Sequence, residues 1–300
     1  MAWKPSLTEL IFGFYAVSIT LEAVLARMAV IKARYRARDT LAAFGMTLGN
    51  VLTNLMMAGI VIAGLGAAYR WRVLTISPHW VWAWALLFVL DDFTYYWFHR
   101  ISHECRLWWA AHVNHHSSQH YNLSTALRQT WTGEIVGTWT PWIPLALIGF
   151  PPQMILLQQT INLFYQFWIH TEAVHRMPRW FEYLFNTPSH HRAHHASNPR
   201  YLDSNYGGVL MVWDRMFGTF AQEVDHDPPR YGIMKNIDTH NPFRIAFHEW
   251  LAMGRDLVRA RSLREVAGVV MGPPGWRADG QGMTSRKVRA AWLATGPDQP

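Results

Sequence analysis

Histidines are concentrated in the middle third of this 300-residue chain, where 12 of the 16 lie between residues 99 and 195. The densest runs are FHRISHECRLWWAAHVNHHSSQH at 98–120 and SHHRAHH at 189–195. Residues three or four positions apart share a face of a helix, so close pairs and triplets should present convergent imidazoles. The predicted groups are His99 with His103, His112 with His115 and His116, and His191 with His194 and His195.

These groups predict metal coordination. Crowded imidazoles are unfavourable at neutral pH unless they stay neutral and a cation takes their lone pairs. Eight or more imidazoles exceed the ligand set of one tetrahedral zinc ion, so two metal ions fit better. Cys105 is the only cysteine, which excludes a thiolate cluster and an intramolecular disulfide and leaves nitrogen and oxygen ligands. The isolated histidines are expected to be ordinary core or surface residues, namely His79, His226, His240 and His248.

Acidic residues accompany the first histidine pair. Asp92, His99 and His103 fall on one stripe of a helix that rises out of a membrane. We expect Asp92 to accept the ring N–H of a metal-bound histidine, because a buried acid needs a partner. Asp91 is expected to be a helix-end charge that reaches for water. Glu104 follows His103 and is a candidate ligand, supporting group or proton carrier, and spacing alone does not choose among these.

Composition and hydropathy predict a membrane protein. Half of the residues are apolar, 17 are tryptophan and the mean hydropathy is near zero, which suits a chain that is part embedded and part polar. Residues 40–69 contain no charge and exceed the roughly 20 apolar residues that a bilayer requires. Weaker candidate spans are 10–26, 80–98 and a helical hairpin over 134–170 divided at Pro151 and Pro152. For each span the alternative is a buried helix of a soluble protein.

A basic linker sets the expected orientation. The linker carries Arg27, Lys32, Arg34, Arg36 and Arg38, whereas the next loop carries only Arg70 and Arg72. The positive-inside rule places the linker in the cytoplasm, and the later crossings then return every histidine group to that face. The net charge of +7 comes without a nucleic-acid-binding motif, so attraction to an anionic leaflet explains it better.

The predicted fold is all-α: an integral membrane bundle of about four to five helices or half-helices, with a cytoplasmic helical cap that carries the histidine groups. Its expected parts are an N-terminal helix and linker (1–39), a catalytic domain (40–225) and an amphipathic helical tail (226–300). Residues 200–220 are expected to cover the histidines. Ser262 and Glu265 form a capping-box signature. The tail helices suit either a membrane interface or docking on the domain.

The motifs HRISH, HVNHH and HRAHH resemble the three histidine boxes of the fatty acid hydroxylase and sterol desaturase superfamily, which are integral membrane di-iron enzymes. Segments such as DFTYYWFHRISHE and FNTPSHHRAHH are similar to its alkylglycerol monooxygenase branch. The resemblance implies that His99, His103, His112, His115, His116, His191, His194 and His195 bind iron, with His170 as a further ligand. His175 and His190 match the pattern less well.

The resemblance also implies a function. O2 would be activated at two iron ions to hydroxylate or desaturate a lipid chain, with Glu104 and Asp92 in support. Ether lipids, fatty acyl lipids, ornithine lipids and sterols are candidate substrates. No strand–GxGxxG–helix fingerprint is present, so electrons should come from a tetrahydropterin or an external electron-transfer protein.

Two alternatives use the same histidines. A membrane metal transporter or metal-storage protein would place them near the bilayer midplane between inverted repeats, and no repeat is visible. A membrane zinc hydrolase is not indicated, because the chain has no HExxH motif.

Overall fold

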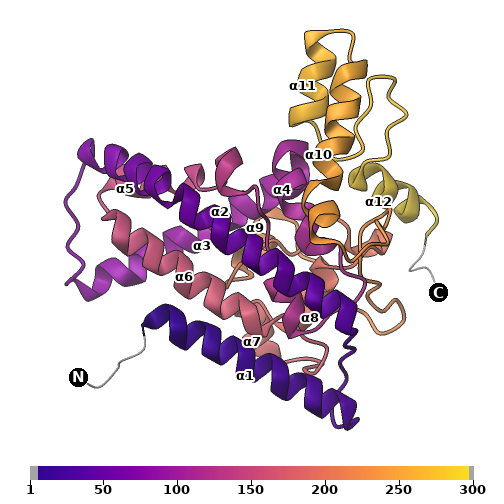
Figure 1. Cartoon of the computed structure of the whole chain (residues 1–300), viewed down its shortest axis with the longest axis horizontal. Helices are drawn as coiled ribbons and strands as arrows, with labels where there is room; N and C mark the ends of the chain where they lie inside the picture. Colours follow the sequence, from indigo (N-terminus) through magenta and orange to yellow (C-terminus); the bar gives the residue numbers. More distant parts are fainter. Residues whose placement is uncertain (1–5, 297–300) are drawn as a thin grey trace.

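The protein is described here by a computed structural model of residues 6–296, which is built from helices (Figure 1). These residues form no β-strand, only isolated bridges between Phe185 and Leu210 and between Ala196 and Tyr231. The all-α prediction is therefore confirmed. The α-helices are α1 (Leu7–Arg27), α2 (Ala37–Arg70), α3 (Val81–Glu104), α4 (Arg106–His116), α5 (Ile143–Ile148), α6 (Pro152–Trp168), α7 (Arg179–Leu184), α8 (Pro188–His194), α9 (Val212–Phe217), α10 (Pro242–Arg259), α11 (Leu263–Met271) and α12 (Ser285–Ala294), and the 3₁₀ helices are η1 (Leu123–Leu127), η2 (Glu134–Val136), η3 (Thr140–Trp142) and η4 (Pro199–Tyr201).

Two of the helices are long and apolar enough to cross a membrane. In the described part of the chain these are α1, with 21 residues, and α2, with 34. Apolar side chains on their outer surfaces are exposed. Leu55 and Met56 of α2 are 70% and 80% exposed, as expected for side chains that contact lipid. The further membrane segments expected in α3 and in the 134–170 hairpin stay predictions.

Glycines let α2 pack closely against the segment that follows the histidine-bearing α4. A Cβ on Gly49 would lie 2.1 Å from Cε2 of Trp131, and one on Gly64 would lie 2.4 Å from Cη2 of Trp139. The indole of Trp131 also donates to the carbonyl of Met46 at 2.9 Å. Both indoles therefore occupy grooves in α2 that any larger residue would fill.

Two buried acids near the linker between α1 and α2 fasten the histidine-bearing half to the apolar half. Glu22 of α1 accepts a hydrogen bond from the backbone N–H of Leu123 at 2.8 Å and another from the hydroxyl of Thr171. Asp39 of α2 pairs with the buried guanidinium of Arg128 at 3.2 Å. The segments around the histidines therefore sit at the basic-linker ends of α1 and α2. Glu22, which weakens the apolar pattern of its span, forms this attachment.

The expectation that Asp91 reaches for water is wrong. Its side chain is fully buried and accepts hydrogen bonds from Nε1 of Trp142 at 2.7 Å and Nδ2 of Asn162 at 3.0 Å. The reason is that α3 continues to Glu104, so residue 91 lies in the middle of the helix and faces η3 and α6. The chain turns only at Cys105, whose extended backbone separates α3 from α4.

The glycine grooves of α2 give a testable expectation. Replacing Gly64 by Leu should force the indole of Trp139 out of place and destabilise the protein by about 1–3 kcal/mol, the usual cost of overpacking. Gly59→Leu is the matched control, because a Cβ there meets nothing within 4 Å. Thermal unfolding of both variants in detergent, followed by circular dichroism, makes the comparison. Equal midpoints for the two variants would contradict the packing described.

Candidate metal centre

Three sequence groups of histidines combine into two spatial groups. Within each group, one ligand atom from every residue lies within 4.8 Å of the others. The first group contains His99 and His103 of α3, His112 and His116 of α4, and His194 of α8; the second contains His115, His170, His191 and His195. All nine histidines predicted as ligands are thus brought together.

Two of the three boxes, HVNHH and HRAHH, divide between the two groups. On α4, His112 and His116 share a face, whereas His115 lies to the side of it and reaches His170 instead. At α8, His194 belongs to the first group. His191 and His195, which are four positions apart, belong to the second. The expectation that each box forms its own cluster was therefore incorrect. The reason is helical geometry, since positions i+3 and i+4 diverge to opposite sides of position i.

The ring nitrogens are spaced like ligands of a common ion. Donor atoms at right angles around a metal with bonds of about 2.1 Å lie about 3 Å apart. A ring nitrogen offers either one hydrogen or one lone pair, so it cannot bond to two other ring nitrogens at once. Several Nε2 atoms here have two such neighbours. The Nε2–Nε2 separations are 3.1 Å for His99–His112 and His112–His116, 3.1 Å for His115–His170, 3.0 Å for His170–His191 and 3.2 Å for His191–His195.

Other nitrogens in the first group have no hydrogen-bond partner within residues 6–296. Nε2 of His103 and Nε2 of His194 are both buried without a hydrogen bond. An orphaned buried acceptor costs about 1–3 kcal/mol unless something satisfies it. A metal ion bound by the group would take the lone pairs of these two nitrogens and also that of Nε2 of His112, which has two nitrogen neighbours.

Backbone carbonyls orient three of the rings. Nδ1 of His99 lies 2.9 Å from the carbonyl of Tyr206, and Nδ1 of His194 lies 2.8 Å from that of Ser204. In the second group, Nδ1 of His170 lies 2.8 Å from the carbonyl of Gln166. A carbonyl can only accept, so Nδ1 carries the hydrogen in each ring. The lone pair is then on Nε2, which faces the group, an arrangement usual for metal-binding histidines.

Burial keeps the imidazoles neutral. Loss of hydration lowers the pKa of both His194 and His170 to about 4. Burial, followed by the influence of neighbouring imidazoles, also lowers the pKa of His116 and His195 well below the ordinary value. Near neutral pH each ring therefore offers a lone pair and not a second N–H, which is the state that binds a metal.

The donor set fits two neighbouring transition-metal ions. Neither group includes an aspartate or glutamate among the described residues, so every donor is an imidazole nitrogen. Imidazole suits iron, zinc, copper and nickel. The groups touch, because the rings of His116 and His195 stack with centroids 4.3 Å apart. Iron, the metal that the resemblance implies, is compatible with these residues.

Asp92 does not contact a histidine, contrary to expectation. Its carboxylate accepts from the backbone N–H of Val209 at 2.7 Å and of Leu210 at 3.0 Å, and from the indole of Trp213 at 2.9 Å. The backbone carbonyl of Tyr206, and not Asp92, accepts the hydrogen bond from Nδ1 of His99. Asp92 instead holds the segment whose carbonyls, at Ser204 and Tyr206, orient His194 and His99.

A second acid, Asp214, braces the same segment. Its two oxygens accept from the backbone N–H groups of Tyr206 at 2.8 Å and Gly207 at 2.7 Å. Gly208 follows in a space so tight that a Cβ would lie 2.7 Å from Oδ1 of Asn162. The prediction that residues 200–220 cover the histidines is confirmed, but the sequence did not reveal the role of Asp214. The signal available in the sequence was the position of Asp214 a few residues after the pair Gly207 and Gly208.

The remaining candidates lie outside both groups. Glu104 is 38% exposed at its side chain and pairs with Arg100 at 3.1 Å. His190 is buried beside the ring of Phe220, and His175 is 66% exposed at its side chain. None of the three belongs to either histidine group.

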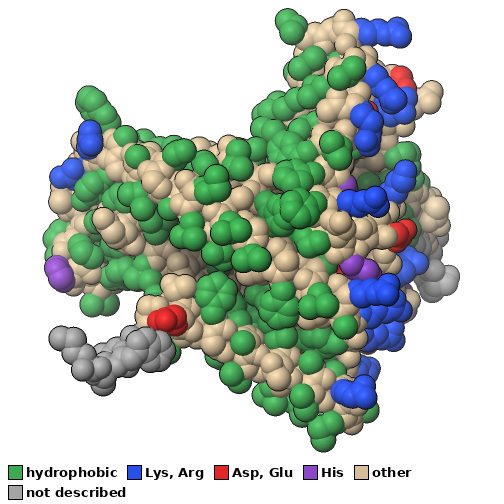
Figure 2. All heavy atoms as spheres, in the orientation of Figure 1, with side chains coloured by type: hydrophobic (Ala, Val, Ile, Leu, Met, Phe, Trp, Pro, Cys, Tyr) green, Lys and Arg blue, Asp and Glu red, His purple; other side chains and the backbone are tan. Residues whose placement is uncertain are grey.

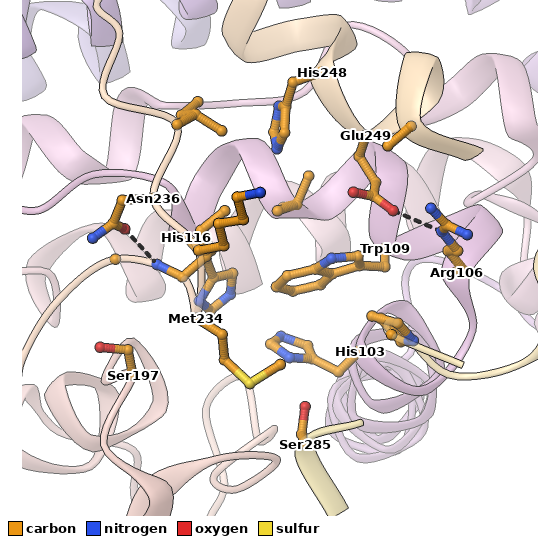
Figure 3. A pocket seen from close by; sticks show the side chains of 18 of the residues that line it. His103, Arg106, Trp109, His116, Ser197, Met234, Asn236, His248, Glu249 and Ser285 are labelled. Carbon is orange, nitrogen blue, oxygen red and sulfur yellow. Dashed lines mark hydrogen bonds and ion pairs between the residues drawn. The ribbon is translucent and has the colours of Figure 1, made fainter. Parts of the chain in front are cut away.

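Two cavities reach the histidines. The larger, of about 730 Å³, is lined by α4, α10 and residues 232–239 and touches His103, His116 and His194; we call it the polar cavity (Figure 3). The smaller, of about 410 Å³, lies among α1, α2 and α6 and touches His112, His115 and His170; we call it the membrane cavity. The membrane cavity therefore meets both metal groups, whereas the polar cavity meets only the first.

The division of the boxes predicts separable metal losses. His103→Ala should remove about one metal ion from the first group and His115→Ala about one from the second, because each deletes a ligand of a single group. His175→Ala is the control and should keep the full content. Elemental analysis of the purified variants measures the outcome. Full metal content in both ligand variants would rule out the assignment.

The hydrogen bonds of Asp92 predict that its replacement weakens metal binding at the first group without abolishing it. Asp92→Asn turns an acceptor into an N–H₂ group that faces other N–H donors, so the segment at 206–210 should loosen and the orientation of His99 with it. Loss of such supporting contacts typically lowers metal affinity about 10–100-fold. Competition with a chelator should show this at the first group only. An equal loss at both groups, or none with Asp92→Asn, would speak against this role.

Comparisons with known proteins agree with the site. The family model described as fatty acid hydroxylase matches residues 84–219. Alkylglycerol monooxygenase of Homo sapiens is 36% identical over 266 residues, which cover 88% of this chain and 58% of that protein. The alkylglycerol monooxygenase of Xenopus tropicalis is 37% identical over 244 residues, covering 80% and 53%. Ornithine lipid hydroxylase OlsE of Rhizobium tropici is 26% identical over 232 residues, covering 72% and 67%.

The chain spans a little over half of the length of the vertebrate alkylglycerol monooxygenases that it matches. No solved structure matches it significantly. The matched residues 84–219 contain the three boxes, His170, Asp92 and the segment that covers the histidines. Residues 84–219 therefore form a fatty acid hydroxylase domain, and this domain gathers the predicted metal ligands.

Proposed function

We propose that this protein is a membrane di-iron monooxygenase that hydroxylates a C–H bond of a lipid chain. The observation that carries the proposal is the membrane cavity, which connects apolar helices to histidines of both metal groups. Iron ions held by the nine histidines would supply activation of O2, so that one oxygen atom enters the C–H bond and the other leaves as water with electrons and protons from a reductant.

The walls of the membrane cavity suit an alkyl or acyl chain. Apolar and aromatic side chains of α1, α2 and α6 line it, among them Phe12, Val51 and Leu163. Because the outer faces of these helices are apolar and exposed, a lipid would enter from the bilayer without crossing water. The deep end at His112 and His115 would hold the reacting carbon.

The lining of the same cavity also includes polar groups. Oε2 of Glu134 is buried without a hydrogen-bond partner, and Asn54 of α2 lies in the same lining. An unpaired acid inside a membrane protein is costly and usually functional. We take these groups to accept hydrogen bonds from hydroxyls near the reacting carbon, which favours a lipid with free hydroxyls over a simple hydrocarbon chain.

The names of the relatives rank the substrates. Those at 36–41% identity are alkylglycerol monooxygenases, so an ether lipid of glycerol is our first candidate. An ornithine lipid comes second, from a relative at 26% identity, and fatty acyl or sterol lipids follow. The matches to hydroxylases do not favour the alternative of a metal transporter.

The polar cavity offers a separate route for electrons. Trp109 and His103 lie side by side in its wall, near Met234 and the paired Arg106 and Glu249 (Figure 3). We assign the entry of the reductant, a tetrahydropterin or an electron-transfer protein, to this cavity. Lipid and reductant would then approach the first metal group from different cavities.

The two acids have indirect roles in this proposal. Asp92 would keep His99 and His194 oriented through the covering segment, and Glu104, at the surface beside His103, would pass protons from water. The metal groups lie at the basic-linker end of α1 and α2, so the positive-inside rule would place them on the cytoplasmic side of the inner or plasma membrane.

Isotopically labelled O2 tests the reaction. Purified, iron-loaded protein with a chemical reductant should transfer label into a 1-O-alkylglycerol with free hydroxyls, and less into its hydroxyl-blocked analogue. Ornithine and fatty acyl lipids are assayed in parallel by mass spectrometry. His194→Ala should abolish transfer, because it removes a ligand, whereas His175→Ala should preserve it. The proposal fails if the loaded enzyme labels none of these lipids.

A further inference from the structure

Helices α10 and α11 form a hairpin that projects from the body (Figure 1). Phe243, Phe247 and Val258 recur along one face of α10, at the spacing of an apolar stripe. Val258 is 88% exposed, and so is Leu263 at the start of α11. Ser262 caps α11 by accepting from the backbone N–H of Glu265, as the capping signature predicts. Large apolar side chains are therefore exposed together on a surface that no described segment of the chain covers.

The flank of this apolar stripe is basic. Arg259, Arg261 and Arg264 are all exposed, and none of their guanidinium groups has an acidic partner among the described residues. The one acid of α11, Glu265, accepts from the backbone N–H of Arg261 at 2.8 Å. The acids of α10 point elsewhere, because Glu249 and Asp256 both pair with Arg106 at 2.7 Å. The outward side of the hairpin thus carries unbalanced positive charge beside an apolar face, the arrangement of helices that lie in a membrane interface.

The apolar face continues from the membrane helices. Phe243 packs edge-on against Trp131 with centroids 5.1 Å apart, and Trp131 lies in the groove of α2 at Gly49. Figure 2 shows apolar side chains spread over α1 and α2 and onward along the hairpin, while most Lys and Arg side chains lie along the right-hand edge of the view, including the outer side of the hairpin. The same edge carries the basic linker between α1 and α2. Both features place the hairpin beside the linker end of the membrane helices.

The hairpin is fixed to the helix that carries metal ligands. Arg106, the first residue of α4, uses its side chain to hold α10, and its backbone N–H donates to the carbonyl of Gly272 at 2.9 Å, just after α11. The Arg106 side chain is only 8% exposed. These contacts fix the position of the hairpin relative to α4.

We propose that α10 and α11 lie in the interface of the anionic leaflet, with the apolar stripe among the acyl chains and Arg259, Arg261 and Arg264 at the lipid headgroups. Charge complementarity and the continuity with α2 select a lipid surface over a second copy of the chain. Through Arg106, the hairpin sets the height of α4 and its histidines above the hydrocarbon. This inference does not depend on the reaction.

Depth-dependent quenching tests the hairpin. Single cysteines at Val258 and Arg259, on a Cys105→Ser background, are labelled with a fluorophore and reconstituted with lipids brominated near the carbonyl. Adjacent positions on α10 face different ways, so the Val258→Cys label should be quenched several-fold more than the Arg259→Cys label. Weak and equal quenching at the two positions, as in water, would overturn the proposal.

The charge is tested in the same system. In phosphatidylcholine vesicles that contain phosphatidylglycerol, the joint variant Arg259→Gln, Arg261→Gln and Arg264→Gln should reduce quenching of the Val258→Cys label relative to the unaltered hairpin. Metal content should not change, since none of these residues touches a histidine group. Spin labels at Val258→Cys that couple to each other, without lipid quenching, would show instead that a second copy covers the face.

Discussion

Nine neutral imidazoles packed against one another are stable only if something positive takes their lone pairs. Ring nitrogens of His112 and His170 each lie about 3 Å from two others, which no pattern of N–H donors can satisfy. The rest of the site serves this constraint. Backbone carbonyls fix the orientation of His99 and His194, and Asp92 and Asp214 hold the segment that supplies those carbonyls.

The position of the histidine groups at one end of the apolar helices depends on buried acids near the ends of those helices. Glu22 and Asp39 attach the histidine-bearing segments to α1 and α2. Arg106 attaches α4 to the hairpin of α10 and α11. These contacts hold the histidine groups at one end of the apolar helices, where two cavities with different linings reach them.

Much of this arrangement could be predicted from the sequence, because the histidine spacing and the apolar stretches are strong local signals. The nine histidines, the all-α fold and the covering segment were found in that way. The division of the HVNHH and HRAHH boxes between the two groups could not be predicted, since it depends on how α4 and α8 are rotated relative to α3 and His170. Asp91 and Asp92 were misplaced for a related reason: the partners of a buried acid lie on elements distant in the sequence, here Trp142 and Val209.

Anomalous scattering at the iron edge, from crystals of the protein as purified, tests the central claim most directly. The account predicts two neighbouring peaks, one enclosed by His99, His103, His112, His116 and His194 and the other by His115, His170, His191 and His195. A single peak, or a second metal ion outside these two groups, would contradict it.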